Sequence, residues 1–172
     1  MISCTEFIPA YSELFRFLEQ RGGEEAVLRY WEAVSRNGIG ALKKLVETHG
    51  IRGCYLYWSH TLNEEAADFT MTLDEDAGVF RLDMTYCPSK GRLLALPDFE
   101  PYHNYCGHCD VLYRRVLEAL GYVYEFDASR CDRAQCAITV KKGGSAHQHT
   151  GINDKQEKHS DHRNHRINGG SL

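Results

Sequence analysis

The sequence lacks the long apolar run of about 20 consecutive residues that a transmembrane helix requires. Residues 1–6 also lack the basic and apolar segments of a secretory signal peptide. Positive charge is not in excess either, because the net charge is −4, whereas proteins that neutralise phosphate groups need clustered basic residues. These absences predict a cytoplasmic protein with no membrane and no nucleic-acid partner.

The C-terminal part of the chain, residues 143–172, has no aromatic residue and no cysteine, yet it holds five of the nine histidines. Such a composition cannot bury enough apolar surface to offset the entropy lost on ordering, so it predicts a disordered tail. Its irregularly spaced histidines could bind transition metals weakly, but a solvated tail is the favoured interpretation. The remaining residues, 1–142, have the length of a single domain.

The spacing of apolar residues predicts helices first and mostly strands afterwards. Three stripes with helical spacing, each ending near a glycine, lie at residues 11–18, 27–34 and 42–49. A period of two then predicts strands at residues 54–58, 69–73 and 80–84, with a hairpin loop at 74–78. A further helix is predicted at 107–120, followed by strands at 122–126 and 136–141. This order is typical of an α+β fold in which N-terminal helices pack on an antiparallel sheet.

Disulfide pairing cannot account for all the cysteines, because the chain has seven of them, an odd number. In a reducing compartment, metal binding and catalysis are the usual roles of clustered thiols. Cys4 and Cys54 are not expected to take part, since free cysteine is among the most buried residue types. The candidates for metal binding or catalysis are therefore the cysteines after residue 80.

Four of these cysteines stand at the ends of predicted strands and helices: Cys87, Cys106, Cys109 and Cys136. Side chains at the ends of rigid elements commonly converge on a pocket, so we expect these thiols to approach one another, with His103 or His108 nearby. Cys106 and Cys109 open a predicted helix, whose positive end favours the thiolate.

Two chemistries without hydrolysis fit the same residues. The tetrapeptide from Cys106 to Cys109 is a redox motif of disulfide isomerases, but no proline follows Pro101 and the preceding stretch is not a buried strand, as a thioredoxin-like fold would need. Two cysteines separated by two residues are also half of a common zinc site, which Cys87, Cys131, Cys136 or a neighbouring histidine would complete. Four such thiols would equally hold an iron–sulfur cluster. Either cofactor would make the chain a binding or regulatory module.

The order of the cysteine-containing motifs along the chain is a further indication of function. A helical first half leads to a strand ending in Cys87-Pro88, Cys109-Asp110 follows about twenty residues later, and Cys136 opens the last strand. Over roughly residues 20–142, this pattern resembles the L-2-amino-thiazoline-4-carboxylic acid hydrolase-like family. The resemblance implies a small α+β domain that opens a sulfur–nitrogen heterocycle by hydrolysis. Cys106 and His108 depart from the pattern, which leaves the metal alternative open.

On the hydrolase interpretation, a thiolate at Cys87 or Cys109 attacks a small-molecule substrate, and His108 or His103 moves the proton. Asp110 completes the candidate set because it follows Cys109 in the motif. An acidic residue in the first turn of a helix is, however, commonly a favourable partner of the helix dipole.

Overall fold

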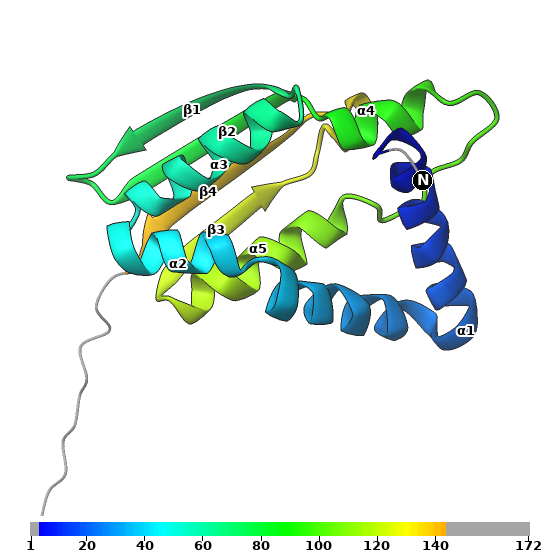
Figure 1. Cartoon of the computed structure of the whole chain (residues 1–172), viewed down its shortest axis with the longest axis horizontal. Helices are drawn as coiled ribbons and strands as arrows, with labels where there is room; N and C mark the ends of the chain where they lie inside the picture. Colours follow the sequence, from blue (N-terminus) through cyan, green and yellow to red (C-terminus); the bar gives the residue numbers. More distant parts are fainter. Residues whose placement is uncertain (1–3, 144–172) are drawn as a thin grey trace, which may run out of the picture.

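A computed structural model describes residues 4–143, with side chains from residue 6 onward, and it has the predicted α+β fold (Figure 1). The predicted tail lies outside the described residues except for Gly143, and so does the side chain of Cys4. The helices are α1 (Cys4–Gly38), α2 (Gly40–His49), α3 (Arg52–Glu64), α4 (Pro88–Ala95), α5 (Gly107–Ala119) and the short 3-10 helix η1 (Cys131–Arg133). The strands are β1 (Asp68–Asp74), β2 (Val79–Tyr86), β3 (Tyr122–Asp127) and β4 (Cys136–Lys142).

The four strands form one antiparallel sheet in the order β1-β2-β4-β3. Successive side chains of a strand point to opposite faces, so Phe80 and Leu82 are buried on one face while Arg81 and Asp83 are exposed on the other. Helices α3 and α5 contact the strands, which gives a layer of helices over the apolar face of the sheet. The predicted antiparallel sheet and its hairpin loop are confirmed. In the described part of the chain, no helix has the length and apolar character needed to cross a membrane.

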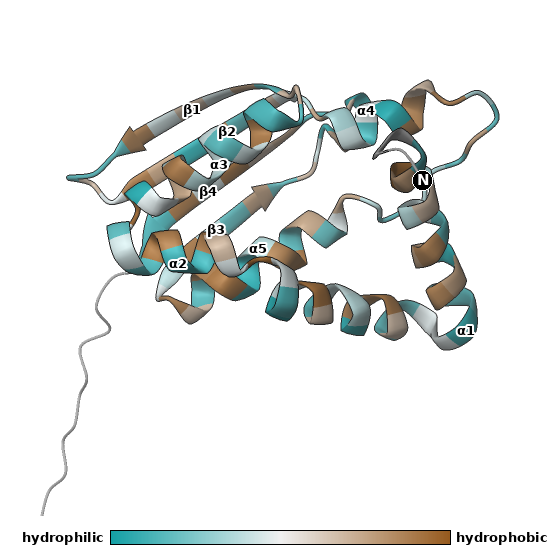
Figure 2. Cartoon of the chain, in the orientation of Figure 1, coloured by the Kyte–Doolittle hydropathy of each residue, from teal (hydrophilic) through white to brown (hydrophobic). Residues whose placement is uncertain are grey.

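Helix α1 consists of two straight legs that meet at a sharp bend (Figure 1). Gly22 and Gly23 interrupt the helical backbone, and Gly23 has a φ of 67°, a conformation that side chains other than glycine rarely adopt. Hydrophobic and hydrophilic segments alternate along both legs (Figure 2), as expected for helices with one buried face. The two stripes predicted at residues 11–18 and 27–34 are therefore the two legs of α1.

One predicted strand is wrong, because residues 54–58 belong to helix α3. The residues that α3 buries include Cys54, Trp58 and Leu62, which follow the helical spacing of four. The indole of Trp58 stacks on the ring of Phe80 in β2 at a centroid distance of 5.3 Å, which fixes α3 on the sheet. The alternation read between residues 54 and 58 arose because apolar and aromatic residues occupy every position of that short window.

The sequence pattern also missed helix α4, which begins directly after Cys87. The Cys87 sulfur caps this helix by accepting a hydrogen bond from the Lys90 amide at 3.5 Å, and Pro88 takes the first helical position, where its missing N–H costs nothing. Cys87 therefore lies at the junction between a strand and a helix. The strand end and the proline that follows it were part of the sequence prediction, whereas the helix was not.

Candidate functional site

Five cysteines gather at the end of the sheet where β2 leads into α4 and where β4 begins. They lie at or near the starts of four elements: Cys87 before α4, Cys106 and Cys109 at the start of α5, Cys131 in η1 and Cys136 in β4. The Cys87 amide donates a hydrogen bond to the Ala134 carbonyl at 2.7 Å, which binds the start of α4 to the segment before β4. Electrostatic repulsion couples the Cys109 sulfur to those of Cys87, Cys131 and Cys136. Cys109 thus lies within electrostatic range of Cys87 and Cys136, and also of Cys131, while a single site shared by Cys87, Cys106, Cys109 and Cys136 stays a prediction.

A hydrogen-bonded pair, His108 and Cys109, lies within this group. His108 Nδ1 bonds to the backbone carbonyl of Tyr105, and because a carbonyl can only accept, Nδ1 carries the proton. The other ring nitrogen, Nε2, then has a free lone pair and accepts the thiol proton of Cys109 at an Sγ–Nε2 distance of 3.4 Å. The Cys109 thiol, the His108 imidazole and the Tyr105 carbonyl therefore form a chain of two hydrogen bonds, in which the carbonyl orients the base.

Burial sets the resting protonation of this pair. It lowers the pKa of His108 to about 4, because an imidazolium would lose its hydration among apolar groups. Burial also raises the pKa of Cys109 well above that of an ordinary thiol, and repulsion from the neighbouring sulfurs adds to the effect. Near neutral pH both groups are uncharged. The expectation that the start of α5 favours a thiolate at Cys109 is wrong, because desolvation outweighs the helix dipole.

Aromatic rings enclose the His108 imidazole on several sides. Its ring centroid lies 4.9 Å from that of Tyr105 and 5.5 Å from that of Tyr11, while Phe15 and Trp31 complete the wall. Within the described residues, the buried Tyr124 hydroxyl has no hydrogen-bond partner. An unpaired buried hydroxyl is uncommon in folded proteins and often has a functional reason. Tyr124 is coupled electrostatically to Cys109, so this hydroxyl belongs to the surroundings of the thiol.

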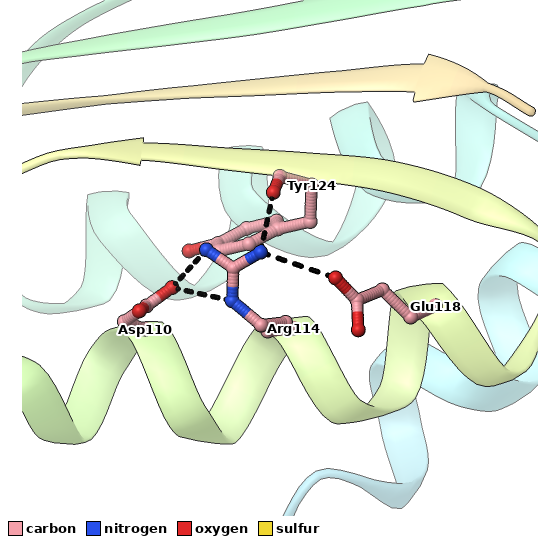
Figure 3. A network of polar contacts seen from close by, with 4 residues as sticks. All are labelled: Asp110, Arg114, Glu118 and Tyr124. Atoms are coloured by element: carbon pink, nitrogen blue, oxygen red, sulfur yellow. Dashed lines mark hydrogen bonds and ion pairs between the residues drawn. The ribbon is translucent and has the colours of Figure 1, made fainter.

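Asp110 belongs to a network of polar contacts around Arg114 (Figure 3). Its Oδ1 accepts hydrogen bonds from Nε and Nη2 of Arg114 at 3.0 and 2.7 Å. Arg114 Nη1 in turn donates to the Tyr124 carbonyl at 2.8 Å and to Glu118 at 3.1 Å. Asp110 thus orients the guanidinium of Arg114, and this guanidinium joins α5 to β3.

Cys106 and Cys131 form a second thiol pair. The two side chains share a hydrogen bond that Cys106 donates, which raises the pKa of Cys106 and lowers that of Cys131. Both line an open depression of about 500 Å³, together with Lys90, His103 and other polar residues. Cys106 therefore interacts with Cys131 as well as with Cys109, and the disulfide-isomerase motif stays a prediction.

His103 lies on the surface in another group, apart from the His108 pair. Its Nε2 is 2.9 Å from Glu19 Oε1, and the imidazole is 60% exposed. Among the residues that the structure describes, three or more candidate ligand atoms lie within 4.8 Å of one another only at Glu19, Glu24 and His103. No three of the described sulfurs meet that distance, so the zinc or iron–sulfur site at Cys87, Cys106, Cys109 and Cys136 stays a prediction without a preformed ligand set.

Sequence reasoning missed the residues that complete these groups. Nothing in the local pattern marks Glu19 and Glu24, which meet only because α1 bends between them. Tyr124 follows the alternation of a strand, which predicts sheet packing, and Cys131, although it could complete a zinc site, stands in a polar stretch that predicts a loop. A sequence signal existed only for Cys131, as a further cysteine close to Cys136.

Comparison with known proteins gives no relative: no family model, no curated protein and no solved structure matches this chain.

Proposed function

We propose that this protein is a hydrolase that acts on a small carbon–nitrogen heterocycle or an amide-like bond, with Cys109 as nucleophile and His108 as general base. The observation that supports the proposal is the bond from the Cys109 thiol to His108 Nε2, in an imidazole whose tautomer the Tyr105 carbonyl fixes. A nucleophile within hydrogen-bond reach of a base, which a third group orients, is the arrangement that covalent catalysis requires.

The neutral resting state defines how the pair would work. When the Cys109 sulfur attacks an electrophilic carbon, its proton passes to His108 Nε2, which is free to accept it because burial keeps the imidazole uncharged. The imidazolium then returns the proton to the leaving nitrogen or sulfur, and water hydrolyses the bond between Cys109 and the substrate carbon. Tyr124, with its unpaired hydroxyl, supplies a donor for negative charge that develops on the substrate.

The substrate class follows from the resemblance of the Cys87-Pro88, Cys109-Asp110 and Cys136 pattern to the L-2-amino-thiazoline-4-carboxylic acid hydrolase-like family. An electrophilic ring carbon between nitrogen and sulfur suits attack by a thiol.

The test is to incubate the full chain with L-2-amino-thiazoline-4-carboxylate and to follow the appearance of a product heavier by one water, by mass spectrometry. We expect turnover by the wild type and a loss of at least about a hundredfold in Cys109→Ser and His108→Gln, the usual scale for a general base. His103→Gln is the matched control, since this exposed histidine belongs to another group. Equal activity of Cys109→Ser, or a loss in His103→Gln as large as in His108→Gln, would refute the assignment.

A second candidate function is reversible thiol oxidation, and the hydrogen bond between Cys106 and Cys131 favours it. In this reaction the Cys131 thiolate attacks hydrogen peroxide, takes one oxygen to become a sulfenic acid and releases the other as water. The Cys106 thiol then displaces the sulfenic oxygen as a second water and forms the disulfide. Two thiols are oxidised, and one peroxide is reduced to two waters.

Peptide mapping after treatment with hydrogen peroxide separates this candidate from the isomerase-like alternative. We expect a crosslinked peptide that joins Cys106 to Cys131, which persists in Cys109→Ser and disappears in Cys131→Ser. A crosslink between Cys106 and Cys109 would support the disulfide-isomerase spacing instead, and unmodified thiols would remove the redox candidate.

A further inference from the structure

Two carboxylates and one imidazole meet on the surface beside the bend of α1. One ligand atom each from Glu19, Glu24 and His103 lies within 4.8 Å of the other two. His103 Nε2 approaches Glu19 Oε1 to 2.9 Å, and the Tyr102 hydroxyl donates to the same oxygen at 2.8 Å. His103 also borders the depression that Cys106 and Cys131 line, but the group takes no part in the hydrolytic reaction proposed above.

The bend of α1 is what brings the two carboxylates together. On an uninterrupted helix, two residues five positions apart point in directions that differ by about 140°, so Glu19 and Glu24 would not face one another. The non-helical backbone at Gly22 and Gly23 turns the chain between them and places both side chains at the inner corner of the bend.

His103 is held at this corner by the loop between α4 and α5. The Tyr102 amide donates a hydrogen bond to the buried Ser12 hydroxyl at 2.8 Å, and the Arg16 guanidinium bonds to the Glu100 carbonyl. Both contacts fix the loop to the first leg of α1, so residues far apart in the sequence form the group. The position of the imidazole is therefore set by two anchors outside the group itself.

The protein offsets the charge of Glu19 in part, through the nearby Arg16 and the hydrogen bonds from Tyr102 and His103, but it does not offset that of Glu24. Glu25, next to Glu24, pairs with Arg29, and Glu13 pairs with Arg16, whereas the described residues offer Glu24 no hydrogen-bond or ion-pair partner. Two carboxylates held within 4.8 Å of one another repel unless a cation lies between them. A neutral imidazole does not remove that repulsion, but it does provide a nitrogen ligand.

We propose that Glu19, Glu24 and His103 bind one divalent transition-metal ion, of the class of Mn²⁺, Fe²⁺, Co²⁺ or Zn²⁺. Carboxylate oxygens together with an imidazole nitrogen suit these ions, whereas Mg²⁺ and Ca²⁺ take oxygen ligands. On binding, His103 presents the Nε2 lone pair to the metal and carries its proton on Nδ1. The Tyr102 hydroxyl keeps its bond to Glu19 and orients that carboxylate, as partners of metal ligands commonly do. Water completes the coordination on the exposed side.

The test has to locate the metal, because histidines in residues 143–172 would also bind it. We would titrate the full, tag-free chain with Mn²⁺ and record the paramagnetic broadening of assigned amide signals by NMR. The expected result is broadening at residues 19–24 and 102–104 at the lowest Mn²⁺ concentrations. His103→Gln and Glu24→Gln should each require at least about tenfold more Mn²⁺ for the same broadening at these residues.

His60→Gln is the matched control, because His60 forms an exposed pair with Glu64 at 3.6 Å and no third candidate ligand among the described residues lies beside them. It should leave the Mn²⁺ titration unchanged. His103 is exposed, so its replacement should preserve the fold, and the undisturbed amide spectrum before metal addition verifies this. Broadening at residues 19–24 that survives His103→Gln, or broadening confined to residues outside this corner, would overturn the proposal.

Discussion

The imidazole of His108 shows how burial decides the chemistry of a single residue. Aromatic rings from both legs of α1 and from the loop before α5 surround it, and they leave Nε2 facing a thiol instead of water. A histidine in that setting stays uncharged at neutral pH, and its Nε2 accepts a hydrogen bond from the thiol. The same burial that prepares it for the proposed reaction makes it a weak point of the fold in acid.

The stability of the protein should therefore fall more steeply with acid when His108 is present. In the unfolded chain its pKa is near 6.5, and in the folded protein it is about 4. Between these values the unfolded state binds a proton that the folded state does not, so stability is lost as the pH falls from about 6.5 to about 4 and is unaffected above that window. The expected loss between pH 7 and pH 4.5 is roughly 2 kcal/mol. Urea unfolding at pH 7 and pH 4.5 measures it.

In His108→Gln this component disappears, while the carboxylates titrate as before. The difference in the free energy of unfolding between the wild type and the variant should thus shift against the wild type on acidification. A difference that stays constant over the window would show that His108 is protonated in the folded protein.

The reactivity of each cysteine thiol should follow its surroundings and not its position at the end of a helix or strand. Burial raises the pKa of Cys136 and of Cys54 to about 12, whereas the hydrogen bond from Cys106 and the charge of Lys90 lower that of Cys131. We expect iodoacetamide to label Cys131 at least about tenfold faster than Cys136 at pH 7, since each pKa unit changes the thiolate fraction tenfold. Mass spectrometry of peptides labelled over pH 5–9 gives the rates.

Cys106→Ala should slow the labelling of Cys131, because the donor of the hydrogen bond is removed, and Cys106→Ser should slow it less, because a hydroxyl can still donate. Faster labelling of Cys87 or Cys109 than of Cys131 would instead favour the thiolates that the sequence indicated at the ends of these elements.

At the scale of helices and strands, the sequence predicted elements whose periodicity ran over a long enough window. Both legs of α1 were predicted because Gly22 and Gly23 mark the break and apolar residues repeat on either side of it. The hairpin and the last two strands follow a clean alternation of buried and exposed residues. Helix α3 was missed because aromatic residues fill its first turns, so the helical repeat emerges only when the window extends to Leu62.

The crossing of α2 and α3 depends on a residue without a side chain, Gly53. A Cβ atom at this position would lie 2.4 Å from the Leu45 carbonyl oxygen, and backbone atoms cannot move aside as a flexible side chain can. We expect Gly53→Ala to separate the two helices and to lower the free energy of unfolding by about 1–3 kcal/mol, the usual cost of overpacking.

Gly40→Ala is the control, because nothing lies within 4 Å of a Cβ there and alanine is a better helix former. It should leave stability unchanged or raise it slightly in urea unfolding. Equal stability of Gly53→Ala and the wild type would mean that the two helices can pack further apart at no cost.

At the scale of the whole molecule, each candidate site is assembled from segments far apart in the sequence. The cysteines come from the starts of α4, α5, η1 and β4, and His103 reaches α1 across more than eighty positions. The sequence indicated that element ends would meet, and this followed from the order of helices and strands. It could not indicate burial, which depends on what packs against an element, nor the meeting of Glu19 and Glu24, which depends on the angle of the bend.

Trp58 also makes long-range contacts, and these contacts join three elements. Its indole stacks on Phe80 of β2 at an interplanar angle of 4° and meets Tyr113 of α5 edge-on at 5.2 Å, while its backbone belongs to α3. Trp58→Ala removes the side chain from a fully packed position, so we expect a loss of about 3–5 kcal/mol in the free energy of unfolding.

Tyr55→Ala is the matched control on the same helix, because Tyr55 is 39% exposed and should contribute less than about 1 kcal/mol. Far-UV circular dichroism, which reports on all the helices, and near-UV circular dichroism, which reports on the packing of aromatic rings, should give one coincident urea transition for both variants. If Trp58 links the helical layer to the sheet, its removal shifts that transition to lower urea without splitting it. Two separate transitions in Trp58→Ala would contradict this expectation, because they would show that the β1–β2 hairpin with α3 unfolds independently of the α5–β3–β4 part despite the pairing of β2 with β4.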